Sequence, residues 1–76
     1  MATYTKGELN FINEMTRKHL ADWADAQLIT GELPQSKLKG LDPYVEHAVA
    51  KGWLSKATPH RVSSKGYQTA GAYLRR

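Results

Sequence analysis

The chain contains no cysteine, and this absence removes the two commonest means of stabilising a very small domain. There is no disulfide framework and no thiolate zinc site. The three histidines, His19, His47 and His60, fall on separate predicted elements with no i, i+4 pair, so the spacing of metal ligands is also missing. We therefore predict no bound metal and no cofactor, with burial of apolar side chains supplying the stability.

Long apolar runs are absent as well. The longest apolar stretches span only a few residues, and the first six, Met1 to Lys6, carry no segment typical of a signal peptide. We expect no membrane span and a cytoplasmic protein.

Enzyme motifs are lacking too. The chain has no cysteine nucleophile, no G-x-S-x-G and no glycine-rich phosphate loop. Asp22 and Asp25 lie three positions apart on the outer face of a predicted helix, a placement typical of solvated carboxylates rather than of an acid–base pair. The sequence predicts a binding protein with no small-molecule substrate, and not an enzyme.

What is present fits one ordinary globular domain over residues 1–76. The length leaves room for a single core, and 41% hydrophobic with 24% charged residues argues against disorder. Much of the area available for burial belongs to the aromatic side chains. These are Tyr4, Phe11, Trp23, Tyr44, Trp53, Tyr67 and Tyr73.

The charge is unevenly divided along the chain. Residues 1–33 carry three basic and five acidic side chains, a net −2, whereas residues 34–76 carry eight basic and two acidic side chains, a net +6. A strongly basic half indicates a polyanionic partner, and a solvated surface kept for solubility is the other interpretation.

The first helix is predicted over residues 6–29. Thr5-Lys-Gly-Glu8 has the S/T-x-x-E form of a capping box, and Gly31 suits the end of a helix. Leu28 and Ile29 fall outside the apolar face. That face is predicted to contain Leu9, Ile12, Met15, Thr16, His19, Leu20, Trp23 and Ala26.

Three further helices and a hairpin complete the prediction. Pro34 opens a short helix over 34–39, and Asp42-Pro43 opens another over 43–51. Two brief strands around Thr58-Pro59-His60 predict a β-hairpin over 53–64, followed by a helix over 65–75. The fold class is therefore mainly α with a short β-hairpin.

The predicted core joins the first helix to the other elements. Trp23 and Ile12 are expected to pack against Trp53, Val45 and Leu74, with Ala48 and Val49 also facing inward.

Three local patterns in this order resemble a winged helix-turn-helix domain. Glu32-Leu33 followed by Gly40-Leu41 resembles the E-L-x-x-x-L-G-L start of a helix-turn-helix. Ala48-Val-Ala-Lys-Gly-Trp-Leu54 is similar to the L-x-x-x-G-L-L passage from a recognition helix into the first wing strand. Val62-Ser-Ser-Lys-Gly66 resembles the L-T-x-x-G step into the closing helix. Together they cover roughly residues 32–74.

The resemblance implies double-stranded DNA as partner and transcriptional regulation as function. Such a domain seats its second helix, here 43–51, in the major groove while the wing touches phosphate or the minor groove. Glu46 on the outer face of that helix does not suit a phosphate. The implied contacts are Gln35, Ser36, Lys37, Lys39, Tyr44, His47, Lys51, Lys56, His60 and Arg61.

A protein-binding module is the alternative interpretation, for example a phage or mobile-element accessory factor that binds a host protein. Phe11 projects away from the apolar face of the first helix and is expected to be exposed. It would seed an interface with a host protein or with a second copy of the chain. The residues predicted for this interface are Tyr4, Phe11, Lys18, Asp22 and Ile29.

Overall fold

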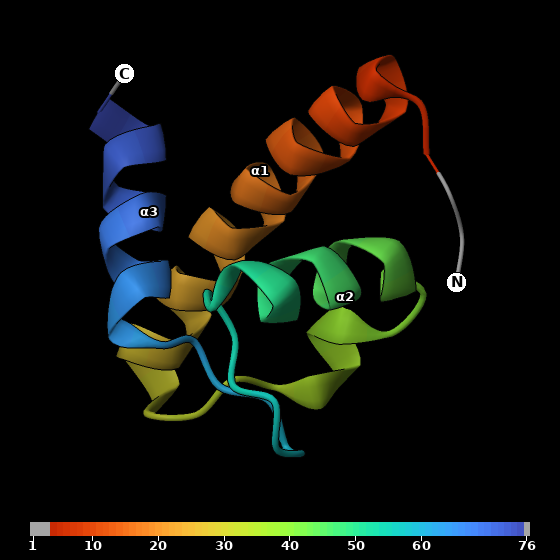
Figure 1. The fold of residues 1–76 in the computed structure, drawn as a ribbon. Coiled ribbons are helices and arrows are strands. Elements are labelled where there is room, and N and C mark those ends of the chain that lie inside the picture. Colours follow the sequence, from red (N-terminus) through yellow and green to blue (C-terminus); the bar gives the residue numbers. More distant parts are fainter. Residues whose placement is uncertain (1–3, 76) are drawn as a thin grey trace.

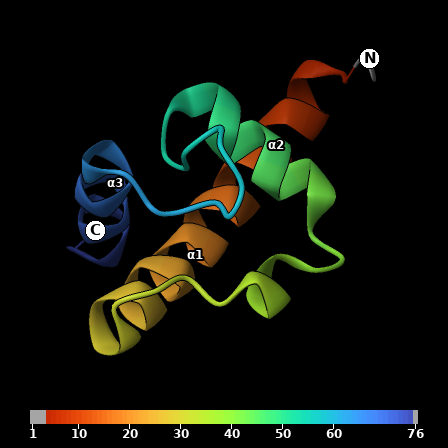
Figure 2. The same cartoon turned by 90° about the horizontal axis from the view of Figure 1, so that it is seen from below.

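A computed structural model of the chain describes residues 4–75, and these residues are mainly helical. The elements in chain order are α1 (Lys6–Thr30), the 3₁₀ helix η1 (Gln35–Leu38), α2 (Asp42–Lys51) and α3 (Ser64–Arg75). α1 is the central element, with α2 and α3 both packed against it (Figure 1). η1 and the tip of the loop between α2 and α3 lie at the same end of the molecule (Figure 1), which we call the loop end and which faces the viewer in Figure 2.

Both ends of α1 follow from local sequence, as predicted. The Thr5 hydroxyl accepts a hydrogen bond from the Glu8 N–H, and the Glu8 carboxylate accepts one from the Thr5 N–H. Gly31 ends the helix with φ of 81°, a conformation that glycine adopts without strain. The helix therefore begins at the predicted residue and ends one residue later than predicted.

The core lies where α1 faces the other elements. Trp23 is 1% exposed, and Ile12 and Trp53 are buried as predicted. Val45 is only half-buried, and the expectation that Leu74 is core is wrong, because its side chain is 69% exposed. α1 and α3 diverge away from the loop end (Figure 1), and the Leu74 side chain stays exposed although it lines a depression between the two helices. Leu9 is also exposed, although it shares the apolar face of α1.

The predicted hairpin over 53–64 is not formed as a wing. Among residues 4–75 the strand pairing is limited to one isolated antiparallel bridge, between Leu54 and Val62. Two backbone hydrogen bonds flank this bridge, from the Ser55 N–H to the Arg61 carbonyl and from the Ser63 N–H to the Trp53 carbonyl, both at 2.9 Å. The N–H groups of Trp53 and Leu54 donate to the Ala48 carbonyl at 2.8 and 3.3 Å, which continues the end of α2.

The second arm of this loop is also held by α1, on the edge that faces away from the first arm. The Gln27 side chain accepts from the Val62 N–H (2.9 Å) and donates to the Val62 carbonyl (3.2 Å). Gln27 is 5% exposed, so both bonds are shielded from water. One buried amide thus occupies the position that a neighbouring strand would take.

Candidate functional site

Five of the ten residues implied as DNA contacts lie together at the loop end. The Gln35 Nε2 donates to the carbonyls of Leu33 (2.8 Å) and His60 (3.0 Å), which ties η1 to the loop after α2. Two adjoining depressions, lined in part by Gln35 and His60, join the group into one surface. We call it the loop–η1 surface; its predicted DNA contacts are Gln35, Ser36, Lys39, His60 and Arg61, and the acidic residues Glu32 and Asp42 line the same depressions.

The loop is shaped by its own side chains. The Ser55 hydroxyl accepts from the Arg61 N–H (2.9 Å), and the Ser55 carbonyl accepts from the His60 Nδ1–H (2.7 Å). The Arg61 guanidinium lies 3.5 Å from the Gly31 carbonyl, at the C-terminal end of α1, where the helix dipole favours a cation. These bonds hold His60 and Arg61 beside η1.

The lysines near this surface differ in their surroundings. Lys39 and Lys56 are exposed, and neither makes an ion pair with any residue in the range 4–75. Lys37 instead lies 3.7 Å from the Asp22 carboxylate, which turns it toward α1. Its carbonyl also accepts a hydrogen bond from the Trp23 indole at 3.3 Å. Lys37 is therefore partly neutralised, whereas Lys39 and Lys56 are free to meet an anion.

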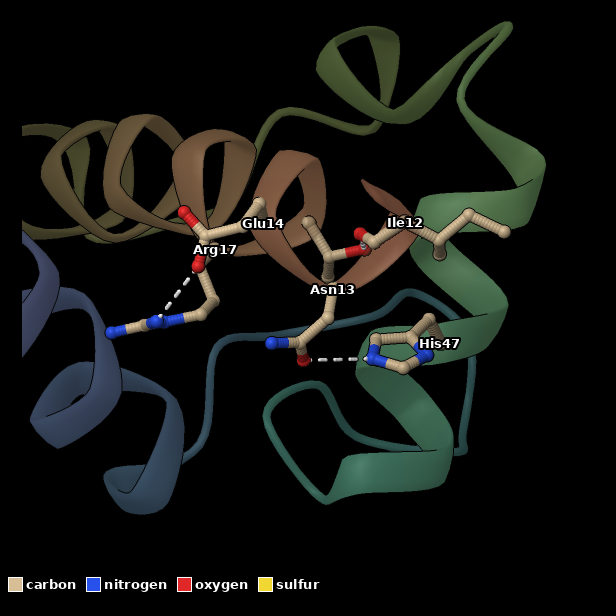
Figure 3. Close-up of polar contacts among 6 residues, drawn as sticks. Ile12, Asn13, Glu14, Arg17 and His47 are labelled. Carbon is tan, nitrogen blue, oxygen red and sulfur yellow. Dashed lines mark hydrogen bonds and ion pairs between the residues drawn. The ribbon is translucent and has the colours of Figure 1, made fainter. Parts of the chain in front are cut away.

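Two predicted contacts on α2 face α1 instead of solvent. The Tyr44 ring lies 5.2 Å from the His19 ring. The His47 Nε2–H donates to the Asn13 Oδ1 at 3.1 Å (Figure 3), and the His47 ring meets the Trp53 ring edge-on. The prediction that these side chains are available to DNA therefore conflicts with their packing.

The solvent face of α2 does not favour a phosphate. Asp42, Glu46 and Lys51 are all exposed there, which gives the face a net charge of −1. Lys51 lies at the end of the helix next to Gly52, where the Lys65 side chain also passes. The basic character of the C-terminal half thus lies in the loops and helix ends rather than along α2.

Packing against α1 also changes the acidity of His47. Burial lowers the pKa of the imidazole below its usual range, because the charged form loses solvation, and the neighbouring Lys51 lowers it further by repulsion. Glu46 and His47 both line a depression between the start of α1 and α2, but the Glu46 side chain is exposed to solvent.

We expect the free energy of unfolding to fall as the pH is lowered from about 7.5 to about 5. Because His47 has the higher pKa when unfolded, protons bind preferentially to the unfolded chain in this window. The full stability is present above the unfolded pKa and is lost as the pH falls through the folded one. Urea titrations across the window measure the slope, and His47→Gln, which keeps a donor toward Asn13, should flatten it. The same slope in the variant would assign it to another group.

The residues of the alternative interface share a side of α1 but do not form one patch. Phe11 is 60% exposed and Ile29 is 75% exposed, as expected. Eighteen residues of helix separate them, which corresponds to about 27 Å. Lys18 and the ion-paired Asp22 lie between them. Tyr4 lines a separate depression between the start of α1 and α2.

A groove between α1 and α3 was not predicted from the sequence. Its floor is made of small residues, and Leu28 and Leu74 stand exposed beside it. We call it the α1/α3 groove; its lining residues are Ala21, Ala24, Asp25, Leu28, Tyr67, Ala70, Gly71 and Leu74. Small residues at helical spacing do not predict a groove, because the same pattern fits two helices in tight contact equally well.

Within residues 4–75 no group of three or more histidine or acidic side chains is arranged to hold a metal ion. In the same range, no helix combines the length and the apolar character that crossing a membrane demands. Comparisons of the chain with known protein families, curated protein sequences and solved structures find no match.

Proposed function

We propose that this protein binds double-stranded DNA through the loop–η1 surface together with Lys56, and that its contacts go to phosphates. The observation that carries the proposal is the placement of Lys39 and Arg61, which make no ion pair with residues 4–75, on two depressions joined by Gln35 and His60. Neutralising phosphates releases counterions, which supplies affinity without any base contact.

The arrangement of α2 supports phosphate contacts over base reading. Base edges are read by forked or amide side chains that enter the major groove. On α2 the two candidates, Tyr44 and His47, pack toward α1, and the exposed Asp42 and Glu46 would meet phosphate oxygens with like charge. We therefore infer an affinity that tolerates changes of DNA sequence.

Salt dependence tests this proposal. Each lost phosphate contact should reduce the slope of log affinity against log salt by about 0.9. The double variant Lys56→Ala, Arg61→Ala should thus shift the slope by nearly 2. Fluorescence anisotropy with a mixed-sequence duplex at low salt measures it, and affinity there should be at least about micromolar.

A charge-matched control separates this surface from general electrostatics. Lys6→Ala, Lys18→Ala removes the same charge from exposed positions on α1 and should leave the slope almost unchanged. An equal shift in the control, or no binding by the parent protein at low salt, would overturn the proposal.

A protein-binding module is the second candidate, favoured by the exposure of Phe11 at 60%. Aromatic side chains supply much of the affinity of protein interfaces, so an unpartnered one marks a candidate anchor. On this alternative, Phe11→Ala removes capture of a partner protein from cell extract, while Lys56→Ala, Arg61→Ala has little effect. The reverse pattern favours DNA binding.

A further inference from the structure

We propose that two copies of this chain associate through the α1/α3 groove, each copy placing a leucine side chain in the groove of the other. The proposal concerns a different surface from the one assigned to DNA and does not depend on it.

The groove has the size of the side chains that stand beside it. Its volume is about 140 Å³. A cavity of about 150 Å³ holds a six-carbon ring, so the groove has room for one leucine side chain. Leu28 is 70% exposed and Leu74 is 69% exposed, one on each of the two helices that form the walls. The same surface thus offers both an apolar pocket and the side chain to fill it.

The two helices run in opposite directions along the groove. At one end, Gln27 of α1 is bonded to Val62, just before α3 begins. Toward the other end, the Arg17 guanidinium of α1 lies 5.6 Å from the centre of the Tyr73 ring near the end of α3. A two-fold axis along the groove therefore places α1 of one copy over α3 of its partner.

Charges on the two walls are complementary under the same axis. Asp25 lies on the α1 wall, and the Arg75 guanidinium folds back over Gly71 of α3, 3.4 Å from where a Cβ would stand. Neither Asp25 nor Arg75 makes an ion pair with residues 4–75. The two-fold axis brings each aspartate toward the partner's arginine at both edges of the interface.

These features favour a second copy over an unrelated protein. A two-fold interface requires one surface to complement itself in shape and in charge, and this surface carries pocket, leucine, acid and base together. A standard interface covers about 800 Å² on each partner. That is a modest part of the 5114 Å² of accessible surface.

Sedimentation velocity from about 10 μM to about 1 mM tests the association. Leu28→Lys and Leu74→Lys should each weaken the dimer at least about a hundredfold, since every dimer loses two buried leucines. Both side chains are exposed in one copy, so melting at low concentration should be unchanged. Phe11→Lys, about 25 Å along α1 from Leu28, is the control and should leave the dimer intact.

Charge reversal tests the orientation. Asp25→Arg alone and Arg75→Asp alone put like charges opposite each other and should each weaken the dimer about tenfold. The double reversal should restore it. A parent protein that stays monomeric at about 1 mM, or a dimer that dissociates equally with Phe11→Lys, would overturn the proposal. Failure of the double reversal to restore affinity would overturn the two-fold arrangement.

Discussion

Trp23→Ala is expected to destabilise the fold by about 3–5 kcal/mol, a large part of its total stability. Trp23 is 1% exposed, packs within the main hydrophobic cluster and donates from its indole to the Lys37 carbonyl at 3.3 Å. Truncating a buried tryptophan costs about 3–5 kcal/mol. A domain of this length has a total stability of about 4–11 kcal/mol, so the change removes a large part of it.

Urea unfolding followed by circular dichroism measures this loss. Phe11→Ala on the same helix is the matched control, because its side chain is 60% exposed, and the control should change stability by no more than about 0.5 kcal/mol. A cooperative melt of the Trp23 variant within a few degrees of the parent would show that the side chain is not essential to the core.

Gly66→Ala is expected to destabilise the protein strongly despite the high helix propensity of alanine. A Cβ at Gly66 would overlap the Trp53 carbonyl oxygen and lie 2.8 Å from the Val62 Cγ1. The Trp53 carbonyl belongs to the backbone and cannot rotate aside, so α3 has to move away from the loop to make room for the new methyl group. Overpacking of this kind costs about 1–3 kcal/mol and more where the backbone cannot adjust.

Gly71→Ala provides the matched control on the same helix. There a Cβ meets only the far end of the Arg75 side chain, at 3.4 Å, which can swing aside. Alanine in a helix is favoured over glycine by about 1 kcal/mol, so this variant should be slightly more stable than the parent. Thermal melting of the pair gives the comparison, and equal melting temperatures would show that the approach at Gly66 relaxes without cost.

Gly66 also illustrates what the sequence reveals and what it conceals. Its place in Val62-Ser-Ser-Lys-Gly66 suggested a resemblance, but the close approach to the Trp53 carbonyl depends on a residue thirteen positions earlier. The ends of α1, by contrast, were predictable because Thr5, Glu8 and Gly31 act within one turn of each helix end.

The limited extent of the hairpin has a similar origin. Alternating residues on both sides of Thr58-Pro59 favour strands, but the two arms pair only around the Leu54–Val62 bridge, and the outer edge of Val62 bonds to Gln27, 35 positions away in the sequence. A polar side chain on a predicted helix gives no sign of such a bond. Likewise, the inward direction of His47 depends on Asn13 on another helix, so the sequence alone could not show that this predicted contact packs against α1.

The pair of bonds from Gln27 to Val62 has a consequence for how the chain tolerates insertion. The loop is anchored there to α1, and at its other arm Trp53 is anchored to the end of α2. Between these anchors, residues 56–59 are exposed at the tip. Exposed loop tips whose two arms are each anchored to the rest of the fold accommodate extra residues without disturbing the core. An epitope or fluorophore-accepting peptide placed between Ala57 and Thr58 would therefore project from the domain while α1, α2 and α3 keep their packing.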